Sequence, residues 1–522
     1  MLSRTLNFQF ERYISSYVKD CPFHLFDTRR QRNITRSELE DDISTVLMSW
    51  IKCPLTYAEI MAIISSTLPS GWNDELKQIR PYVLSAMAKS PLHEDEHRFI
   101  SVLNGELQAY HSMRRKSIGT PTPHIPIYSV LLTVRDLIEK KRSTHTPITR
   151  NHVIDQISLC GQYAILSHRW YQDNEELSFV DVPNLSHPTV QAKKGYKKLV
   201  GFSKIVQSYY GCRYLWVDSA CISETDRKAS IPLMFAWYRH AYVCVIYLTS
   251  SSTISKDPWS TRGWTLQELL AAERIICFTS DWRPVKDYSQ GTPLFHACRE
   301  DDTSRRAISL VLNECLSVIG NIDWAAYEPG VDQAIHLFRA MGTRETTVPE
   351  DMVYSILAAL DIDVPIEYGE GFDKAFYRLQ AKYLTETSDR RLLAWSGGIS
   401  SPYNSMLAGS FTMPDIAAWH NPEITWPRYP KYHFNASIYF NSNGVMRIMV
   451  SLHQLQKSPS ERYVFAPMGE NTLNGTYIGV LLRNLRDGED ISQALYKRVA
   501  LETCKNTEIS LESKAPSWVF IR

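Results

Sequence analysis

The segment YAILSHRW, residues 163–170, decides the fold expected of this chain, because an apolar run of strand-forming residues ends there in polar and aromatic side chains. Three similar short runs follow: YLWVD at 214–218, YVCVIYL at 242–248 and RIICFTS at 274–280. Helical patterns lie between the runs, the longest being GYKKLVGFSKIVQSYY. This alternation of strand and helix predicts a parallel β-sheet covered by helices on both faces.

Polar and aromatic side chains follow these expected strands at their carboxyl ends. Open parallel sheets bind their ligands just beyond that edge, so these side chains form the candidate site. The candidates are Ser167, His168, Arg169 and Trp170 after the first strand, Asp218 at the end of the second, and Arg262, Trp264 and Glu268 between the third and the fourth. We expect them to meet on one rim of the sheet and to offer hydrogen-bonding, ionic and stacking groups there.

Each candidate also has a purely structural interpretation. Trp264, with several leucines on the same short helix, fits core packing. Glu268 fits a surface carboxylate or a partner of Arg262. Asp218 lies before a turn, where an aspartate often caps the following backbone, and His168 fits a core histidine. The functional interpretation rests on the convergence of all these residues on one rim.

Composition shifts divide the chain into four regions. Residues 1–125 are predicted to be helical, and the proline-rich stretch 116–129 suits a linker to an α/β domain at 126–290. Residues 291–395 return to a helical pattern. Residues 396–522 then alternate in the manner of strands and predict a β-rich C-terminal domain.

Bulk composition indicates a folded protein of several domains. The 522 residues are 44% hydrophobic and 22% charged, and 57 Lys and Arg nearly balance 56 Asp and Glu, for a net charge of +1. This balance argues against binding of nucleic acid or an anionic membrane through net charge. The ten cysteines form no CxxC pair, and no apolar run reaches the roughly 18 residues of a membrane span. Free thiols and a charged N-terminal segment make the cytoplasm the expected location.

Two other motifs match known chemical patterns but fit them poorly. His93-Glu94-Asp95-Glu96-His97 matches the H-E-x-x-H zinc pattern, yet its charged central residues and the lack of a downstream ligand favour an exposed acidic helix start. Gly369-Glu370-Gly371 lacks the third glycine and the preceding strand of a dinucleotide fingerprint. We therefore interpret it as a turn before a helix and predict no metal site.

Four blocks of the middle region resemble the ordered signature blocks of the fungal heterokaryon incompatibility (HET) domain. They are Leu166-Ser167-His168-Arg169-Trp170, Trp216-Val217-Asp218 with Cys221-Ile222, Trp237-Tyr238-Arg239-His240-Ala241, and Thr261-Arg262-Gly263-Trp264-Thr265-Leu266-Gln267-Glu268-Leu269. Two later segments, 347–357 and 368–371, resemble stretches that often follow this domain. Arg169 departs from the family pattern, which commonly has a small or polar residue there. The resemblance implies a trigger or effector of self/non-self recognition and programmed cell death.

The HET domain is in turn similar to TIR domains, flavodoxin-like modules of which some hydrolyse NAD with a single glutamate. This similarity implies that Glu268, four residues after Trp264, is the catalytic glutamate. It also implies nucleotide contacts for Ser167, His168, Arg169, Trp170, Asp218, Arg262 and Trp264. One carboxylate can suffice, because nicotinamide leaves as a neutral pyridine and needs no general acid. No cofactor is required, and NAD would be the substrate.

Two classes of function follow from the resemblance. In the first, the domain self-associates or binds other incompatibility proteins, and Glu268 only stabilises the fold. In the second, the domain is an NAD glycohydrolase that releases nicotinamide. The sequence slightly favours the first class, because residues at a rim fit either role while catalysis demands a particular geometry. The position of Glu268 relative to Ser167 and Trp170 distinguishes the two.

Overall fold

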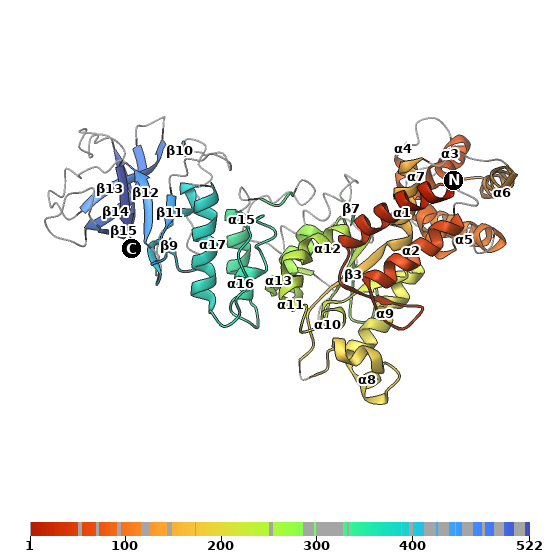
Figure 1. Cartoon of the computed structure of the whole chain (residues 1–522), viewed down its shortest axis with the longest axis horizontal. Helices are drawn as coiled ribbons and strands as arrows, with labels where there is room; N and C mark the ends of the chain where they lie inside the picture. The colour runs from red at the N-terminus through yellow and green to blue at the C-terminus, as the bar shows by residue number, and fades with distance from the viewer. Residues whose placement is uncertain are drawn as a thin grey trace. The chain divides into compact units, whose positions relative to one another are not determined.

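The chain forms two compact units in the computed structural model, which Figure 1 shows from the N-terminus in red to the C-terminus in blue. The first unit comprises Met1–Ser252 with Ala272–Cys298, and the second comprises Thr253–Ala271 with Arg299–Arg522. The structure describes residues 2–50, 55–68, 73–90, 96–115, 125–143, 149–172, 174–249, 254–285, 297–298, 327–330, 334–387, 389–395, 400–411, 424–425, 438–443, 445–450, 463–471, 476–484, 495–505 and 517–521.

The first unit is built on a sheet whose four central strands are parallel. These are β3 (Tyr163–His168), β4 (Tyr214–Trp216), β5 (Val243–Tyr247) and β6 (Arg274–Phe278). They lie in the order β4-β3-β5-β6, and every residue in them except Arg274 is buried. Such complete burial is the pattern of a sheet covered on both faces. The predicted α/β architecture and its four parallel strands are confirmed.

A hairpin near the N-terminus, within the region 1–125 that was expected to be helical, extends this sheet. Strands β1 (His24–Asp27) and β2 (Arg32–Thr35) pair antiparallel with each other, and β1 pairs antiparallel with β4. At the other edge, β7 (Ala297–Cys298) pairs antiparallel with β6. The hairpin strands have four residues each, too few to show the two-residue alternation that identifies a strand in a sequence.

Helices of the first 161 residues fall into two groups in the first unit. In one group, α1 (Leu2–Lys19), α2 (Arg36–Trp50) and α7 (Arg150–Gly161) contact one another. In the other, α3 (Tyr57–Thr67), α4 (Asn73–Lys89), α5 (Glu96–Arg115) and α6 (Ile127–Ser143) share a hydrophobic core. Of the zinc-like motif, residues 93–95 lie outside the described residues, as do residues 116–124 of the expected linker.

Local sequence accounts for where these helices begin and which face they bury. Thr56 and Glu59 form a capping box at the start of α3, in which each side chain accepts the other's backbone N–H. Ile60 and Ile64, one turn apart, then both face the core. Helix α9 (Lys194–Tyr210) is followed by Gly211, whose φ of 66° is the left-handed conformation that glycine adopts readily.

The remaining elements of the first unit lie between β3 and β5. They are η1 (Phe179–Asn184), α8 (Pro188–Ala192), α9 (Lys194–Tyr210), α10 (Asp218–Cys221), α11 (Arg227–Ser230), η2 (Ile231–Leu233) and α12 (Met234–His240). Along α9 the buried residues recur three and four apart, which is the spacing of a helix with one face on a core.

Helices of the second unit come from two separate stretches of chain. Among the described residues they are η3 (Ile254–Lys256), η4 (Pro258–Thr261), α13 (Gly263–Ala271), α15 (Ala334–Gly342), α16 (Asp351–Tyr354), α17 (Phe372–Thr387) and η7 (Arg390–Leu393). Gly369 and Gly371, with φ of 91° and 80°, form the expected turn directly before α17. Residues 299–326 of the stretch with the expected helical pattern lie outside the described residues.

Strands of the second unit follow these helices. Within the described residues, β8 (Ser400–Ser401) pairs with β9 (Asn404–Ala408). A seven-stranded sheet there has the order β10-β13-β14-β15-β16-β12-β11. Its strands are β10 (Ile424–Thr425), β11 (Ile438–Phe440), β12 (Met446–Val450), β13 (Tyr463–Asn471), β14 (Thr476–Asn484), β15 (Leu495–Lys505) and β16 (Ser517–Ile521).

Candidate functional site

Asp218 connects the carboxyl ends of β3 and β4. It begins α10 just after β4, and its Oδ1 lies 3.0 Å from Nε2 of His168. Its Oδ2 accepts a hydrogen bond of 2.9 Å from Nε1 of Trp170. The backbone N–H of Ser219 donates to Oδ1 at 2.7 Å. His168 and Trp170, at and after the end of β3, therefore both contact Asp218, which follows β4, at the edge where these residues were expected.

Exposure differs sharply among these three residues. His168 and Asp218 are 1% and 6% exposed, whereas Trp170 is 43% exposed. The buried carboxylate thus holds an exposed indole by its N–H, and its other oxygen faces a buried imidazole. Because the N–H of Trp170 already has a partner, the indole offers its ring rather than its donor to an approaching molecule.

Ser167 and Arg169 lie on either side of His168 along the chain but in different surroundings. Ser167 is fully buried inside the sheet, opposite Ile246 of β5, so its hydroxyl is not at the surface. Arg169 is exposed, and its backbone carbonyl accepts a hydrogen bond of 3.5 Å from Nζ of Lys198. Of the two, only Arg169 presents its side chain to solvent beside Trp170.

A buried ion pair lies at the same edge and was not predicted. Nζ of Lys198, a residue 1% exposed on α9, donates to Oε2 of Glu176 at 2.6 Å. The same oxygen accepts the backbone N–H of Tyr171 at 2.9 Å, and the ammonium lies 4.5 Å from the centre of the Tyr171 ring. A lysine on the buried face of an amphipathic helix indicates that some buried partner is present, but the sequence does not identify Glu176 as that partner.

Two tyrosines continue the polar contacts across the sheet edge. The hydroxyl groups of Tyr171 and Tyr247 lie 3.1 Å apart, and the Tyr247 hydroxyl donates to the carbonyl of Ser280 at 3.1 Å. These contacts link the segments after β3, β5 and β6. Burial raises the pKa of both phenols, so both stay protonated at neutral pH and act as hydrogen-bond donors.

Trp264 belongs to the second unit, where Asp351 holds it. Nε1 of Trp264 donates to Oδ2 of Asp351 at 3.1 Å, and the Tyr368 hydroxyl donates to Oδ1 at 2.8 Å. The block at 261–269 and the two later family-like segments therefore meet at one carboxylate. This contact favours the structural interpretation of Trp264.

Arg262 and Glu268 lie in the same part of the second unit. Nη1 of Arg344, which is 4% exposed, donates to the Arg262 carbonyl at 2.7 Å and to Oγ1 of Thr265 at 2.9 Å. The backbone N–H of Gly263 donates to the Glu345 carbonyl at 2.9 Å. These bonds anchor the start of α13. Glu268, further along that helix, is 1% exposed.

Neither unit contains the complete set of candidate residues. The first holds Ser167, His168, Arg169, Trp170 and Asp218, and the second holds Arg262, Trp264 and Glu268. Within the first unit, the structure brings His168, Trp170 and Asp218 into contact. Glu268 shares its unit with Trp264, whose indole N–H is bonded to Asp351.

Metal-binding clusters and membrane-spanning helices are absent from the part of the chain that the structure describes. No group of three or more His, Cys, Asp or Glu side chains there is arranged to hold a metal ion. Among the same residues, no helix has both the length and the apolar character needed to cross a membrane. Burial raises the pKa of the Cys21 and Cys221 thiols to about 12, which makes them poor nucleophiles at neutral pH.

Known proteins match the part of the chain that carries the His168, Trp170 and Asp218 contacts. Residues 163–255 match the family model described as heterokaryon incompatibility protein (HET). The chain is also 33% identical over 237 residues to the vegetative incompatibility protein HET-E-1 of Podospora anserina. That alignment covers 42% of this chain but spans only 16% of the length of the relative. No solved structure matches the chain.

Proposed function

Because residues 163–255 belong to the heterokaryon incompatibility (HET) family, we propose that this chain is an incompatibility protein, a trigger or effector of fungal self/non-self recognition that leads to programmed cell death. The matched residues include β3, β4 and β5 and the contacts among His168, Trp170 and Asp218. The name of the relative mentions vegetative incompatibility only. Cell death and the mode of action are our proposal.

Within this role the HET domain is an interaction module, and Trp170 is its main contact residue. The observation that carries this proposal is that Trp170 is 43% exposed while the buried Asp218 holds its indole N–H. A large aromatic ring already fixed in place loses little conformational entropy when a partner covers it. Tryptophan and arginine are also the residues most enriched at interface hot spots, and Arg169 is exposed directly beside Trp170.

The partner that fits best is another HET domain, of this chain or of a second incompatibility protein. Numbered along the chain, the parallel strands lie in the order 2-1-3-4, which is how the flavodoxin-like order 2-1-3-4-5 begins. This order supports a TIR-like fold, the resemblance from which self-association was inferred. The net charge of +1 supports the same partner, since two copies repel each other little. Neither nucleic acid nor membrane is part of the proposal.

An NAD glycohydrolase that uses Glu268 is the alternative function. Its support is the position of Glu268 four residues after Trp264 in the family-like block. Two observations count against it. Glu268 is 1% exposed, and Trp264, which the hypothesis places beside the nucleotide, donates to Asp351 instead. A catalytic carboxylate must reach the ribose of bound NAD, so this function requires a rearrangement that uncovers Glu268.

The test of the proposed function is induced expression of the full chain in a filamentous fungus that lacks it. We expect the wild type to reduce the number of viable cells and Trp170→Ala, at equal protein level, to restore viability. Tyr128→Ala is the matched control, because Tyr128 is an aromatic residue 77% exposed on α6, outside the HET match. Loss of viability with Trp170→Ala equal to that with the wild type would contradict the interaction module.

A parallel assay separates the alternative function from the proposed one. The purified full chain is incubated with NAD at several protein concentrations, and released nicotinamide is measured. The interaction module predicts no release above that of heat-inactivated protein. Release that depends on protein concentration and disappears in Glu268→Gln would support the glycohydrolase instead.

A further inference from the structure

Helix α13 belongs to one unit although the strands before and after it along the chain belong to the other. Strands β5 and β6 are neighbouring parallel strands of the first unit's sheet, and α13 is in the stretch of chain that connects them. Thr253–Ala271, which contains α13, is nevertheless part of the second unit. Within that unit α13 contacts η4, α15 and α16. The second unit therefore holds the connection between two central strands of the first.

Backbone contacts join the start of α13 to residues 343–351, which we call the 343–351 segment. The N–H of Gly263 donates to the Glu345 carbonyl at 2.9 Å, and the N–H of Glu345 donates to the Thr261 carbonyl at 2.7 Å. The two stretches are so close that a Cβ at Gly263 would lie 2.5 Å from Cγ2 of Thr346. The helix thus begins against this segment.

Two side chains of the same segment add further bonds to α13. Nη1 of Arg344 donates to the Arg262 carbonyl at 2.7 Å and to Oγ1 of Thr265 at 2.9 Å. Oδ2 of Asp351 accepts from Nε1 of Trp264 at 3.1 Å. Arg344 and Asp351 are 4% and 5% exposed. Hydrogen bonds to charged groups at such low exposure contribute more than neutral bonds at the surface, so they hold α13 firmly.

The 343–351 segment is in turn anchored to α17 and, through it, to a C-terminal strand. Oε1 of Glu350 accepts the backbone N–H groups of Gly369 and Gly371, directly before α17, at 2.7 and 2.9 Å. On α17, the side-chain amide of Gln380 donates to the Ala408 carbonyl of β9 at 2.9 Å and accepts its N–H at 3.0 Å. Contacts thus run without interruption from β9 through α17 and the 343–351 segment to α13.

The position in which α13 is held buries polar groups at a cost. Every residue of α13 except Trp264 is buried. Gln267 is fully buried, and neither its Oε1 nor its Nε2 has a hydrogen-bond partner within the described residues. A buried amide without partners has lost its hydration and gained nothing in exchange, so Gln267 would regain hydrogen bonds in water. The contacts with the 343–351 segment therefore keep α13 in a position that is unfavourable for one of its own side chains.

We propose that the second unit restrains this incompatibility protein, because the 343–351 segment holds α13 in its buried position, and that release of α13 activates the chain. The inference rests on the proposed function. While α13 is held, Trp264 is its one residue that is not buried, so Gln267 and Glu268 reach a partner or a substrate only after release. Loosening the contacts of the segment should therefore raise the activity of the chain, whereas contacts with a purely structural role predict lower activity when they are removed.

Hydrogen–deuterium exchange of the purified full chain, followed by mass spectrometry, measures the restraint itself. Trp264→Phe removes one bond from the side of the helix, and Arg344→Met removes two from the side of the segment. Loss of one net hydrogen bond makes local opening about fivefold more frequent, so peptides within 263–271 should exchange about fivefold faster in Trp264→Phe. Arg344→Met should exceed this increase. Peptides of α9, in the first unit, should exchange as in the wild type, which verifies that both variants are folded.

Induced expression in a filamentous fungus that lacks the chain measures the consequence of release. A fivefold larger released population needs about fivefold less protein for the same effect, so the protein level at which half of the cells stay viable should fall about fivefold in Trp264→Phe. Lys382→Ala is the matched control, because it removes an exposed ion pair of α17 and should match the wild type in both assays. Addition of Trp170→Ala to either variant should restore viability.

The outcomes separate this inference from the proposed function. The inference is overturned if exchange in α13 is unchanged in both variants. It is also overturned if exchange is faster but viability equals or exceeds that with the wild type, because the contacts are then structural only. If Trp264→Phe and Arg344→Met lower viability and Trp170→Ala does not restore it, the restraint stands and the role proposed for Trp170 is wrong.

Discussion

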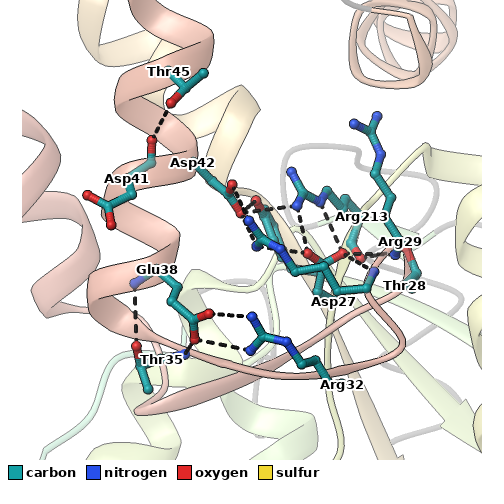
Figure 2. A network of polar contacts seen from close by, with 12 residues as sticks. Asp27, Thr28, Arg29, Arg32, Thr35, Glu38, Asp41, Asp42, Thr45 and Arg213 are labelled. Atoms are coloured by element: carbon teal, nitrogen blue, oxygen red, sulfur yellow. Dashed lines mark hydrogen bonds and ion pairs between the residues drawn. The ribbon is translucent and has the colours of Figure 1, made fainter.

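Replacing Asp27 by alanine is the change whose effect follows most directly from the structure. Asp27 ends β1 and is fully buried, and its carboxylate accepts hydrogen bonds from the Arg30 and Arg213 side chains and from the backbone N–H of Arg29. Figure 2 shows Arg213 and Arg29 beside Asp27. The contact with Arg213 joins the N-terminal hairpin to the start of β4. Asp27→Ala therefore tests whether the hairpin is an integral part of the first unit's sheet.

The expected loss of unfolding free energy follows from how deeply Arg213 and Arg30, the partners of Asp27, are buried. Removal of one member of a buried ion pair typically costs about 3–5 kcal/mol, because the other charge loses its compensation. Arg213 and Arg30 are 21% and 36% exposed, so water replaces part of what is lost and we expect about 2–3 kcal/mol. For a unit of this size, each kcal/mol changes Tm by about 2–4 °C. The expected fall in Tm is about 4–12 °C.

The same carboxylate determines how stability changes with pH. Burial by itself would raise the pKa of Asp27, but hydrogen bonds from Arg213 and the backbone N–H of Arg29, with the charge of Arg213, lower it overall. A pKa lower in the folded than in the unfolded state stabilises the protein above about pH 4, and this contribution is lost as the pH falls through the folded value. The Tm of the wild type should therefore fall more steeply below pH 4 than that of Asp27→Ala.

Differential scanning calorimetry of the full chain at pH 7 and between pH 3 and 4 measures both effects. Arg283→Ala is the control in the same unit, because its ion pair with Asp281 is exposed at both residues and its loss should leave Tm unchanged. If the Tm of Asp27→Ala stays within about 1 °C of the wild type, or its pH dependence matches that of the wild type, the reasoning about this network is wrong.

Three further predictions concern other parts of the molecule. Gly201→Ala should lower Tm by several degrees, because its Cβ would lie 1.9 Å from Nε1 of Trp282, and an unchanged Tm would contradict the close packing. Trp264→Phe removes the hydrogen bond to Asp351 and should lower the free energy of unfolding, measured in urea, by about 1 kcal/mol. If this free energy does not fall, Trp264 is again a candidate ligand-binding residue. Cys221, with a pKa of about 12, should react with a disulfide reagent at pH 8 only after unfolding, and rapid labelling of the native chain would refute its burial.

Features of the fold that the sequence predicts are those with local signals. The four parallel strands are short apolar runs bounded by helical patterns, so periodicity and composition alone identify them. Their parallel arrangement then brings their carboxyl ends to one edge, which is why the contact of Asp218 with His168 and Trp170 was foreseeable.

Features that the sequence did not predict depend on partners far apart in the chain. The hairpin strand β1 is held by Arg213, 186 residues after Asp27, and four residues alone carry too weak a strand pattern. Lys198 finds its partner Glu176 only after α9 packs on the sheet. The pairing of Trp264 with Asp351 likewise joins residues 87 apart. In each case a contact between residues distant in the chain stabilises the element, and the local sequence pattern does not reveal that contact.

The central claim is that the exposed Trp170, fixed by Asp218, is the contact through which this HET domain acts. Sedimentation velocity of the purified full chain over a range of concentrations measures the Kd of self-association for the wild type, Trp170→Ala and the control Tyr128→Ala. A hot-spot tryptophan contributes about 2 kcal/mol, so Trp170→Ala should weaken self-association by about thirtyfold while Tyr128→Ala leaves it unchanged. Equal Kd values for the wild type and Trp170→Ala would contradict the claim, and a monomeric wild type would rule out a second copy of this chain as the partner.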